Sequence, residues 1–336
     1  MKRTIKYLSV FFVLVVAVVV AGVAVLMSMD FNEYRGLIAE QAKAATGRDL
    51  VIAGELNLEI SLNPALAVEG VTFANAAWGS RPEMAKLERL VAEVELMPLL
   101  SGQVHVKRLV LVGLDALLET DAQGRGNWQF AAAEPAPKEA EEAGEAGPLP
   151  VVKKVLIENV KLAYLDGVSG ERTAFDLDRL ELNSEGADSP MLLNIAGSFN
   201  NAAFSASGSL GSVNDLMGGA KPYPLKLSAK AFQTALGLDG TIAKPLQAKG
   251  LDLGLTVSVP DLVKTFKAAA VAVPALKDAD PIPPIAIDFS GQARDIAGGY
   301  ALAGMKLKLG GSDLSGDVSA VLSGARPKID AKLSSS

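Results

Sequence analysis

Apolar and polar residues alternate one by one in six separate stretches of this 336-residue chain. In the longest of them, residues 251–259, every odd position is Leu or Val, and the even positions are Asp252, Gly254, Thr256 and Ser258. Shorter stretches of the same kind lie at residues 56–62, 92–96, 160–164, 225–228 and 305–309. Successive side chains of a β-strand point to opposite faces, so each stretch places its apolar side chains on one face. The sequence predicts a mainly β protein whose strands are apolar on one side only.

Short connections rich in Gly and Asn separate these stretches, as at residues 198–201 and 310–311. Parallel strands need long crossover segments and usually carry continuous apolar runs, so this pattern favours antiparallel pairing. Two helices are expected beside the strands. One covers residues 30–46, with Asp30 as its cap and Gly47 at its end, and the other begins near Asp261 and extends to Ala269.

The N-terminal segment has the properties of a membrane anchor. Residues 7–29 contain no charged side chain, and at about 1.5 Å per residue they span a hydrocarbon core about 30 Å thick. Lys2, Arg3 and Lys6 precede the segment, so the positive-inside rule places the N-terminus in the cytoplasm. A cleaved signal peptide is the alternative, but its apolar region is usually only about 7–15 residues long. We predict a retained anchor.

Composition divides the rest of the chain. Residues 131–150 are rich in Ala, Glu, Pro and Gly and nearly lack large apolar side chains, which predicts a flexible acidic linker. We therefore expect an anchor at 1–29, a helix and β region at 30–130, the linker at 131–150, and a second β region at 151–336. Because the sequence stops directly after a strand-like run, which would leave a bare sheet edge, we expect the second region to be truncated at its C-terminus.

Several functions are disfavoured by the residues that the chain contains. The net charge of −6 argues against a nucleic-acid partner, and the lack of cysteine excludes disulfides and thiolate metal sites. His105 is the only histidine. The neighbouring sequence suggests no partners for it in a catalytic triad, and one histidine is too few for a zinc site. Four acidic residues between Asp176 and Glu185 lack the glycine-containing loop of a calcium site. We expect no enzyme activity, cofactor or metal.

The apolar strand faces are the remaining signal, and alternation alone leaves two interpretations open. The face could pack on a second sheet in a β-sandwich, or it could line an open trough that receives acyl chains. In a trough, a charge at Leu253 or Leu255 should block lipid transit while leaving strand pairing intact. The candidate lining residues are Leu56, Leu58, Ile60, Val94, Leu96, Leu251, Leu253, Leu255 and Val257.

A set of ordered motifs between residues 75 and 128 resembles the AsmA family of bacterial envelope proteins. The first are Asn75-Ala76-Ala77-Trp78-Gly79-Ser80, Met84-Ala85 and Leu96-Met97-Pro98-Leu99-Leu100-Ser101-Gly102. They continue with Leu117-Leu118-Glu119, Asp121, Gly124 and Asn127-Trp128. Later segments are similar to the same family: Gly250-Leu251-Asp252-Leu253, Val273-Pro274-Ala275-Leu276, Gly311-Ser312-Asp313-Leu314-Ser315-Gly316 and Gly324-Ala325-Arg326-Pro327.

The resemblance implies inner-membrane anchoring, a periplasmic body and a role in outer-membrane assembly or envelope lipid homeostasis. It also implies a distant relation to chorein-type bridge proteins, whose curved sheets enclose an apolar trough for phospholipid. These implications favour the trough, with phospholipid and outer-membrane or periplasmic assembly proteins as partners. The alternative is a structural module with a closed β core that scaffolds the assembly of other envelope proteins.

Overall fold

The computed structural model of the chain is mainly β and describes residues 30–59, 61–100, 105–130, 151–218, 221–273, 283–323 and 326–335. Two compact units form, one from residues 1–110 and 129–150 and the other from residues 111–128 and 151–336. The predicted anchor and the predicted linker lie outside the described residues. Among the residues that are described, no helix is both long enough and apolar enough to cross a membrane.

The first unit contains the predicted N-terminal helix and the first antiparallel strands. Asp30 accepts a hydrogen bond from the Asn32 amide at the start of the helix, and Gly47 ends it with a left-handed φ of 71°. Both boundary residues are as predicted. Strand β3 pairs antiparallel with β1, β2 and β4. The elements are η1 (Phe31–Glu33), α2 (Tyr34–Thr46), β1 (Leu50–Ile52), β2 (Leu56–Glu59), β3 (Ala65–Ala74), β4 (Glu83–Val94), α3 (Leu96–Leu100) and β5 (His105–Val112), the last of which ends in the second unit.

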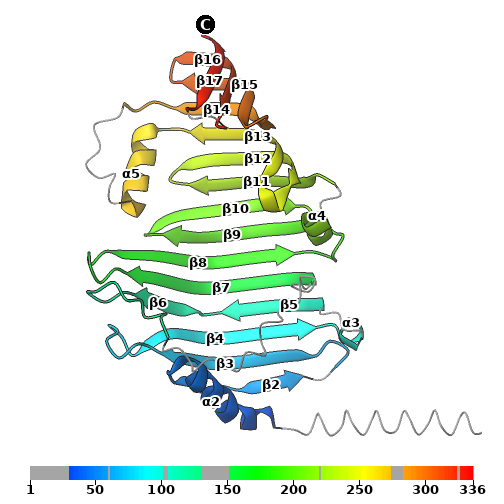
Figure 1. Cartoon of the computed structure of the whole chain (residues 1–336), viewed down its shortest axis with the longest axis vertical. Helices are drawn as coiled ribbons and strands as arrows, with labels where there is room; N and C mark the ends of the chain where they lie inside the picture. The colour runs from blue at the N-terminus through cyan, green and yellow to red at the C-terminus, as the bar shows by residue number, and fades with distance from the viewer. Residues whose placement is uncertain are drawn as a thin grey trace, which may run out of the picture. The chain divides into compact units, whose positions relative to one another are not determined.

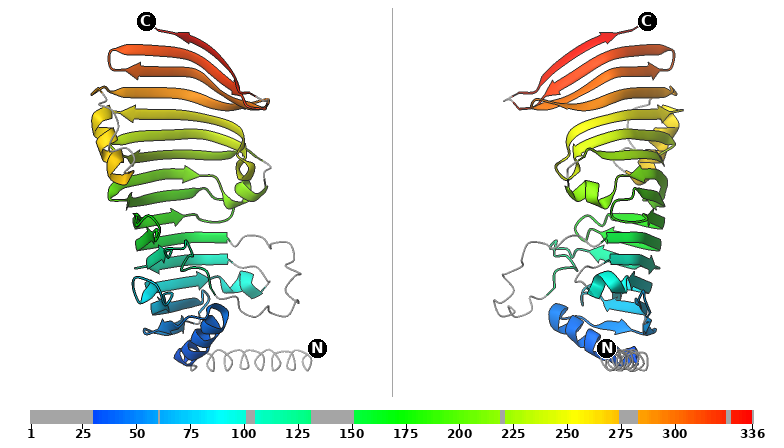
Figure 2. Two further views of the ribbon diagram at one scale, coloured as in Figure 1. Left: turned by 60° about the vertical axis from the view of Figure 1, so that its left-hand side comes forward. Right: turned by 90° about the vertical axis from the view of Figure 1, so that its right-hand side faces the viewer.

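The second unit is built on a curved sheet in which each strand from β7 onward pairs with the next (Figures 1 and 2). Its strands are β6 (Asp115–Glu119), β7 (Val151–Leu165), β8 (Arg172–Asn183), β9 (Met191–Phe199), β10 (Ala202–Leu210), β11 (Tyr223–Ala231), β12 (Thr234–Lys244), β13 (Lys249–Val259), β14 (Ile287–Ile296), β15 (Gly299–Leu309), β16 (Ser312–Val321) and β17 (Lys328–Ser334). Its helices are α4 (Val213–Gly218), η3 (Pro245–Gln247) and α5 (Leu262–Ala272).

Pairing is antiparallel from β7 to β17, as predicted, but not at the start of this unit. Strands β6 and β7 pair in parallel, with Ala116 opposite Leu162 and Leu118 opposite Tyr164. A parallel pair needs a crossover of a dozen or more residues, and the segment between Glu119 and Val151 is long enough to provide it. The sheet of this unit is therefore mixed.

Helices α4 and α5 lie at opposite ends of the middle strands of this unit (Figure 1). Helix α5 begins where it was predicted, with Asp261 as its cap, and extends three residues beyond the predicted end at Ala269. The Asn200 side chain donates a hydrogen bond to the Ala272 carbonyl at its other end. Asn200 and Asn201 form the turn between β9 and β10, and both have positive φ, 46° and 68°. Asn is well suited to such a turn because it tolerates the left-handed conformation.

Candidate functional site

The apolar face of the second unit extends from strand to strand because the alternating stretches are in register. Leu227 on β11 lies opposite Leu238 on β12, which lies opposite Leu255 on β13. The next row joins Ala229, Leu236, Val257 and Phe289 in the same way. Residues that face one another across antiparallel strands share a face of the sheet, so these rows form one continuous apolar surface.

One end of this surface is closed by helix α4. Met191, Tyr223, Leu225 and Leu253 form a buried cluster, and Val213 and Leu216 of α4 pack against it. The Tyr223 hydroxyl donates a hydrogen bond to the Gly211 carbonyl at 3.3 Å, and burial raises the pKa of this phenol. This end of the face is the hydrophobic core of the unit.

The rest of the face is more accessible. Leu227, Leu238 and Leu255 are only partly buried, while Leu236 is 43% exposed and Leu309 is 38% exposed. All described strands of this unit belong to the same sheet. No second sheet packs on the face within the part of the unit that is described, so the alternative β-sandwich interpretation lacks its second layer there.

The four candidate lining residues on β13 lie on this face, but not in equivalent surroundings. Leu251, Leu255 and Val257 are partly buried, whereas Leu253 is only 8% exposed and belongs to the buried cluster. A charge at Leu253 would be buried without a partner, which is costly for folding. Leu253 is therefore unsuited to the charge-substitution test, and Leu255 remains suited to it.

The other candidates belong to the first unit. Leu56 (buried) and Leu58 (partly buried) lie on β2, opposite Val68 and Leu66 of β3, and Val94 ends β4. Leu96 was predicted to be a strand residue, but it begins helix α3. The period of two stops at Val94, and the run of apolar residues around Pro98 forms a short helix instead. Ile60 lies outside the described residues.

The opposite, polar face of the second unit carries a hollow of about 1020 Å³. Alternate positions of the eight successive strands β8 to β15 line it with short or charged residues: Arg179, Asn194, Ala196, Ser205, Ser207, Ser228, Lys230, Ala235, Gly237, Thr256, Ser258, Asp288, Ser290, Lys306 and Lys308. The residues between these positions in the sequence also border it: Ile195, Ala206, Ala229, Leu236, Val257 and Phe289. The trough expected from the sequence was assigned to the apolar face, so this hollow is on the other side of the sheet.

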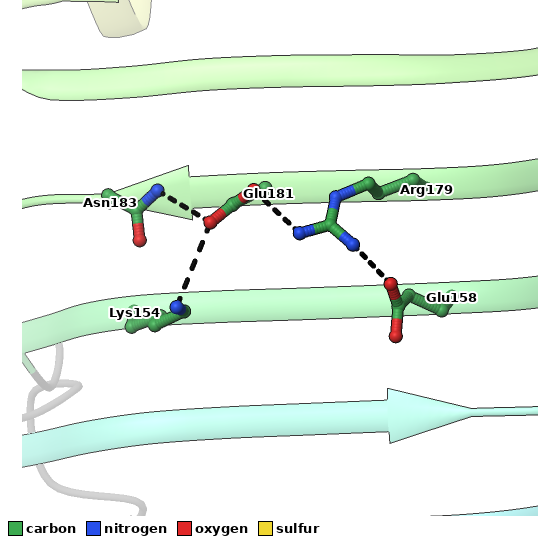
Figure 3. Close-up of polar contacts among 5 residues, drawn as sticks. All are labelled: Lys154, Glu158, Arg179, Glu181 and Asn183. Carbon is green, nitrogen blue, oxygen red and sulfur yellow. Dashed lines mark hydrogen bonds and ion pairs between the residues drawn. The ribbon is translucent and has the colours of Figure 1, made fainter.

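Ion pairs link strands β7 and β8 (Figure 3), and one of their members, Arg179, lines the hollow. The Arg179 guanidinium contacts Glu158 and donates to Glu181 Oε2 at 2.8 Å, while Lys154 Nζ lies 3.7 Å from Glu181 Oε1. Arg179, and then the side-chain amide of Asn183, holds the pKa of Glu181 below its ordinary value. These charges neutralise one another, as opposite charges on neighbouring strands commonly do.

The residues weighed for catalysis and metal binding form no site. His105 lies on β5, and its Nδ1 is 3.4 Å from a Glu95 carboxylate oxygen. An ordinary strand residue makes contacts of this kind. Asp178 is an exposed residue at a register shift in β8. Within the described ranges, no group of three or more His, Asp or Glu residues is arranged to hold a metal ion.

Much of the apolar surface was not predicted residue by residue. Residues 234–242 contribute Leu236, Leu238 and Ile242 to it, and only Gly240 interrupts an alternation that was nevertheless readable. The rows of small polar residues on the other face give no comparable sequence signal, because Ser, Ala and Gly suit any exposed strand position. Only the strand register brings them together.

These observations define a mainly β protein with a large sheet that is apolar on one side. The AsmA family matches residues 1–185, more than half of the chain, and the chain belongs to this family, as its motifs predicted. Family membership suggests an envelope-related function.

Two relatives come from Escherichia coli (strain K12). The AsmA family protein YhjG is 22% identical over 347 residues, covering 94% of this chain and 50% of YhjG. Protein AsmA is 26% identical over 108 residues, covering 32% of this chain and 17% of that protein. The chain thus spans half the length of YhjG and a smaller share of AsmA. No solved structure matches the chain.

Proposed function

We propose that this AsmA-family chain is a non-enzymatic, inner-membrane-anchored periplasmic protein whose apolar sheet face accommodates or conveys phospholipid acyl chains. Residues 7–29 would be the anchor, with the N-terminus in the cytoplasm. In this role the chain would contribute to outer-membrane assembly and envelope lipid homeostasis, with outer-membrane or periplasmic assembly proteins as partners.

The observation that supports this function is the uncovered part of the apolar face between the two helices. Rows such as Leu227, Leu238 and Leu255 continue across many strands without interruption by a charged residue. An uncovered apolar surface of this extent on a soluble domain usually marks a site of interaction. A uniform aliphatic lining suits hydrocarbon, which offers no polar group to recognise.

The free energy of exposing an acyl chain to water shows that an apolar surface alone is sufficient for lipid transfer. Exposing a chain of about 16 carbons to water costs about 0.8 kcal/mol per CH₂, or about 12 kcal/mol in all. A protein that keeps this surface covered removes most of the barrier without any chemical step. The rival function, a scaffold with a closed β core, requires a second sheet over the same face, and the described strands of the second unit supply none.

The test compares charges on the two faces of the same strand. Leu236→Asp places a carboxylate on the apolar face at a side chain that is already 43% exposed, so folding should survive. Ala235→Asp places the same charge one residue away on the polar face, where Ala235 is also exposed. Phospholipid that copurifies with the detergent-extracted full chain is then quantified by mass spectrometry.

We expect Leu236→Asp and Leu255→Asp to lose most of the bound phospholipid and Ala235→Asp to keep it. Hydrogen exchange of β11–β13 checks that each variant is folded. Equal amounts of phospholipid in all four proteins, or none in the parent, would contradict the proposed function.

A further inference from the structure

The polar face of the second unit has a feature that acyl chain binding does not use. Its hollow of about 1020 Å³ is as large as pockets that hold sizeable ligands. The lining side chains come from the two adjacent cross-strand rows described below, so the hollow follows the sheet across its strands.

The first row carries every charged side chain of the hollow except Lys306. Along it, Lys230 lies opposite Ser205 and Ala235, and Lys308 lies opposite Asp288 on one side and Asp313 on the other. The second row is made of hydroxyl and amide groups and ends at a lysine. It consists of Asn194, Ser207, Ser228, Gly237, Thr256, Ser290 and Lys306.

The lysines of the hollow differ from the other cations on the same face. Lys226 pairs with Asp239 at 3.2 Å, and Arg294 pairs with Asp252 at 2.9 Å. By contrast, Lys230, Lys306 and Lys308 have no carboxylate within ion-pairing distance among the described residues. Lys306 and Lys308 also project from the same face two residues apart, about 7 Å along the strand, where like charges repel.

The spacing of these groups indicates an elongated ligand. Lys230 on β11 and Lys306 on β15 are separated by four strand steps of about 4.8 Å, or about 19 Å. One phosphate or carboxylate group cannot contact both. On strands β10, β11 and β13, the side-chain hydroxyls of Ser207, Ser228 and Thr256 have no hydrogen-bond partner in the described part of the protein, so they are free to bond a ligand.

We propose that this hollow binds an anionic carbohydrate chain, with its phosphate or carboxylate groups near the three lysines and its sugar hydroxyls on the row of serine and threonine side chains. A membrane surface is a poorer match, because a bilayer is flat over the length of the hollow and cannot follow its floor. The site is independent of the apolar face on the other side of the same strands.

The test measures binding of a carboxylate-bearing sugar chain to the full protein in uncharged detergent by isothermal titration calorimetry. The probe is an oligogalacturonate of eight residues, with its uncharged methyl ester and short-chain polyphosphate as comparison ligands. We expect saturable binding of the oligogalacturonate, at least about tenfold weaker binding of the methyl ester, and weakening by added salt.

Variants separate the contributions of charge and hydroxyl groups. Lys230→Gln with Lys306→Gln should weaken oligogalacturonate binding at least about tenfold, whereas Lys226→Gln, which removes a lysine paired on the same face, should change it less than about twofold. The double variant Ser207→Ala and Ser228→Ala should bind the oligogalacturonate more weakly and bind polyphosphate as the parent does.

Three outcomes would overturn the proposal: no saturable binding of the oligogalacturonate, an equal loss in Lys226→Gln, or lysine-dependent binding of phosphatidylglycerol vesicles without oligogalacturonate binding. Phospholipid that copurifies with the lysine variants should equal that of the parent, so failure here is distinguishable from failure of the acyl chain function.

Discussion

Asn127 ties strand β6 to the loop that follows it, and replacing this side chain should loosen that strand. Its Oδ1 accepts a hydrogen bond from the Glu119 amide at 3.0 Å, and its Nδ2 donates to the Leu117 carbonyl at 2.9 Å. Asn127 is 0% exposed, and Leu117 and Glu119 are buried beside it. The side chain therefore satisfies two main-chain groups of β6, as a neighbouring strand would.

The magnitude follows from these two bonds. Asn127→Ala leaves one buried N–H and one buried C=O without their partner, and each unsatisfied group costs about 1–3 kcal/mol. The expected destabilisation of this part of the unit is about 2–6 kcal/mol. Because about 1.4 kcal/mol corresponds to a factor of ten, even the lower limit predicts exchange of the β6 amides about 30-fold faster.

Hydrogen exchange followed by mass spectrometry suits this test, because it reports the opening of β6 alone in a long sheet that need not unfold in one step. Asn127→Asp keeps the acceptor for Glu119 but places a carboxylate oxygen against the Leu117 carbonyl at a fully buried position, so its effect should be at least as large as that of Asn127→Ala. Gln123→Ala, at an exposed position in the same loop, is the control. If exchange of β6 in Asn127→Ala stays within about threefold of the parent, the two bonds do not hold the strand.

Two further changes test the sheet and helix α5. Gly240 has a φ of +152°, and an added Cβ would lie 2.1 Å from the Asp252 carbonyl oxygen. Gly240→Ala should therefore speed amide hydrogen exchange in β12 and β13 at least about tenfold. Gly311→Ala is the control, because the space around Gly311 is open and exchange should not change. The hydrogen bond from the Lys264 amide holds the pKa of Asp261 below its ordinary value. Such a carboxylate stabilises the helix fully above its unfolded pKa and loses this effect as the pH falls through its folded pKa. Protection of α5 should therefore drop below about pH 4 in the parent, and Asp261→Asn should lack this drop.

The strand faces were predictable from the sequence because the period of two is a local property. Leu251, Leu255 and Val257 share a face whatever their neighbours are, and the structure places them so. The same argument failed at Leu96, where alternation continued by chance for two residues beyond the end of β4. Strand direction is not encoded in alternation either, so the parallel pairing of β6 with β7 could not be foreseen.

The rest depends on register, which joins residues far apart in the sequence. Leu253 looks identical to Leu255 in the alternating stretch, yet only Leu253 lies in the buried cluster with Met191 and Leu225. Asn127 was recognisable as part of a family motif, but its two bonds to β6 require the loop to fold back on the strand. The lysines of the polar face likewise become a group only when five strands are aligned.

A twisted sheet reconciles an apolar surface on one side with a hollow on the other. Neighbouring strands rotate relative to one another, so a sheet of many strands becomes saddle-shaped, and each face of a saddle is concave along one diagonal. The hollow of the second unit follows the rows that contain Lys230 and Lys308, on the polar side. Concavity of that side does not close the apolar side, whose rows around Leu238 and Leu255 remain only partly buried. The same strands can therefore present hydrocarbon-binding and anion-binding surfaces back to back, and a charge on one surface should leave the other unaffected.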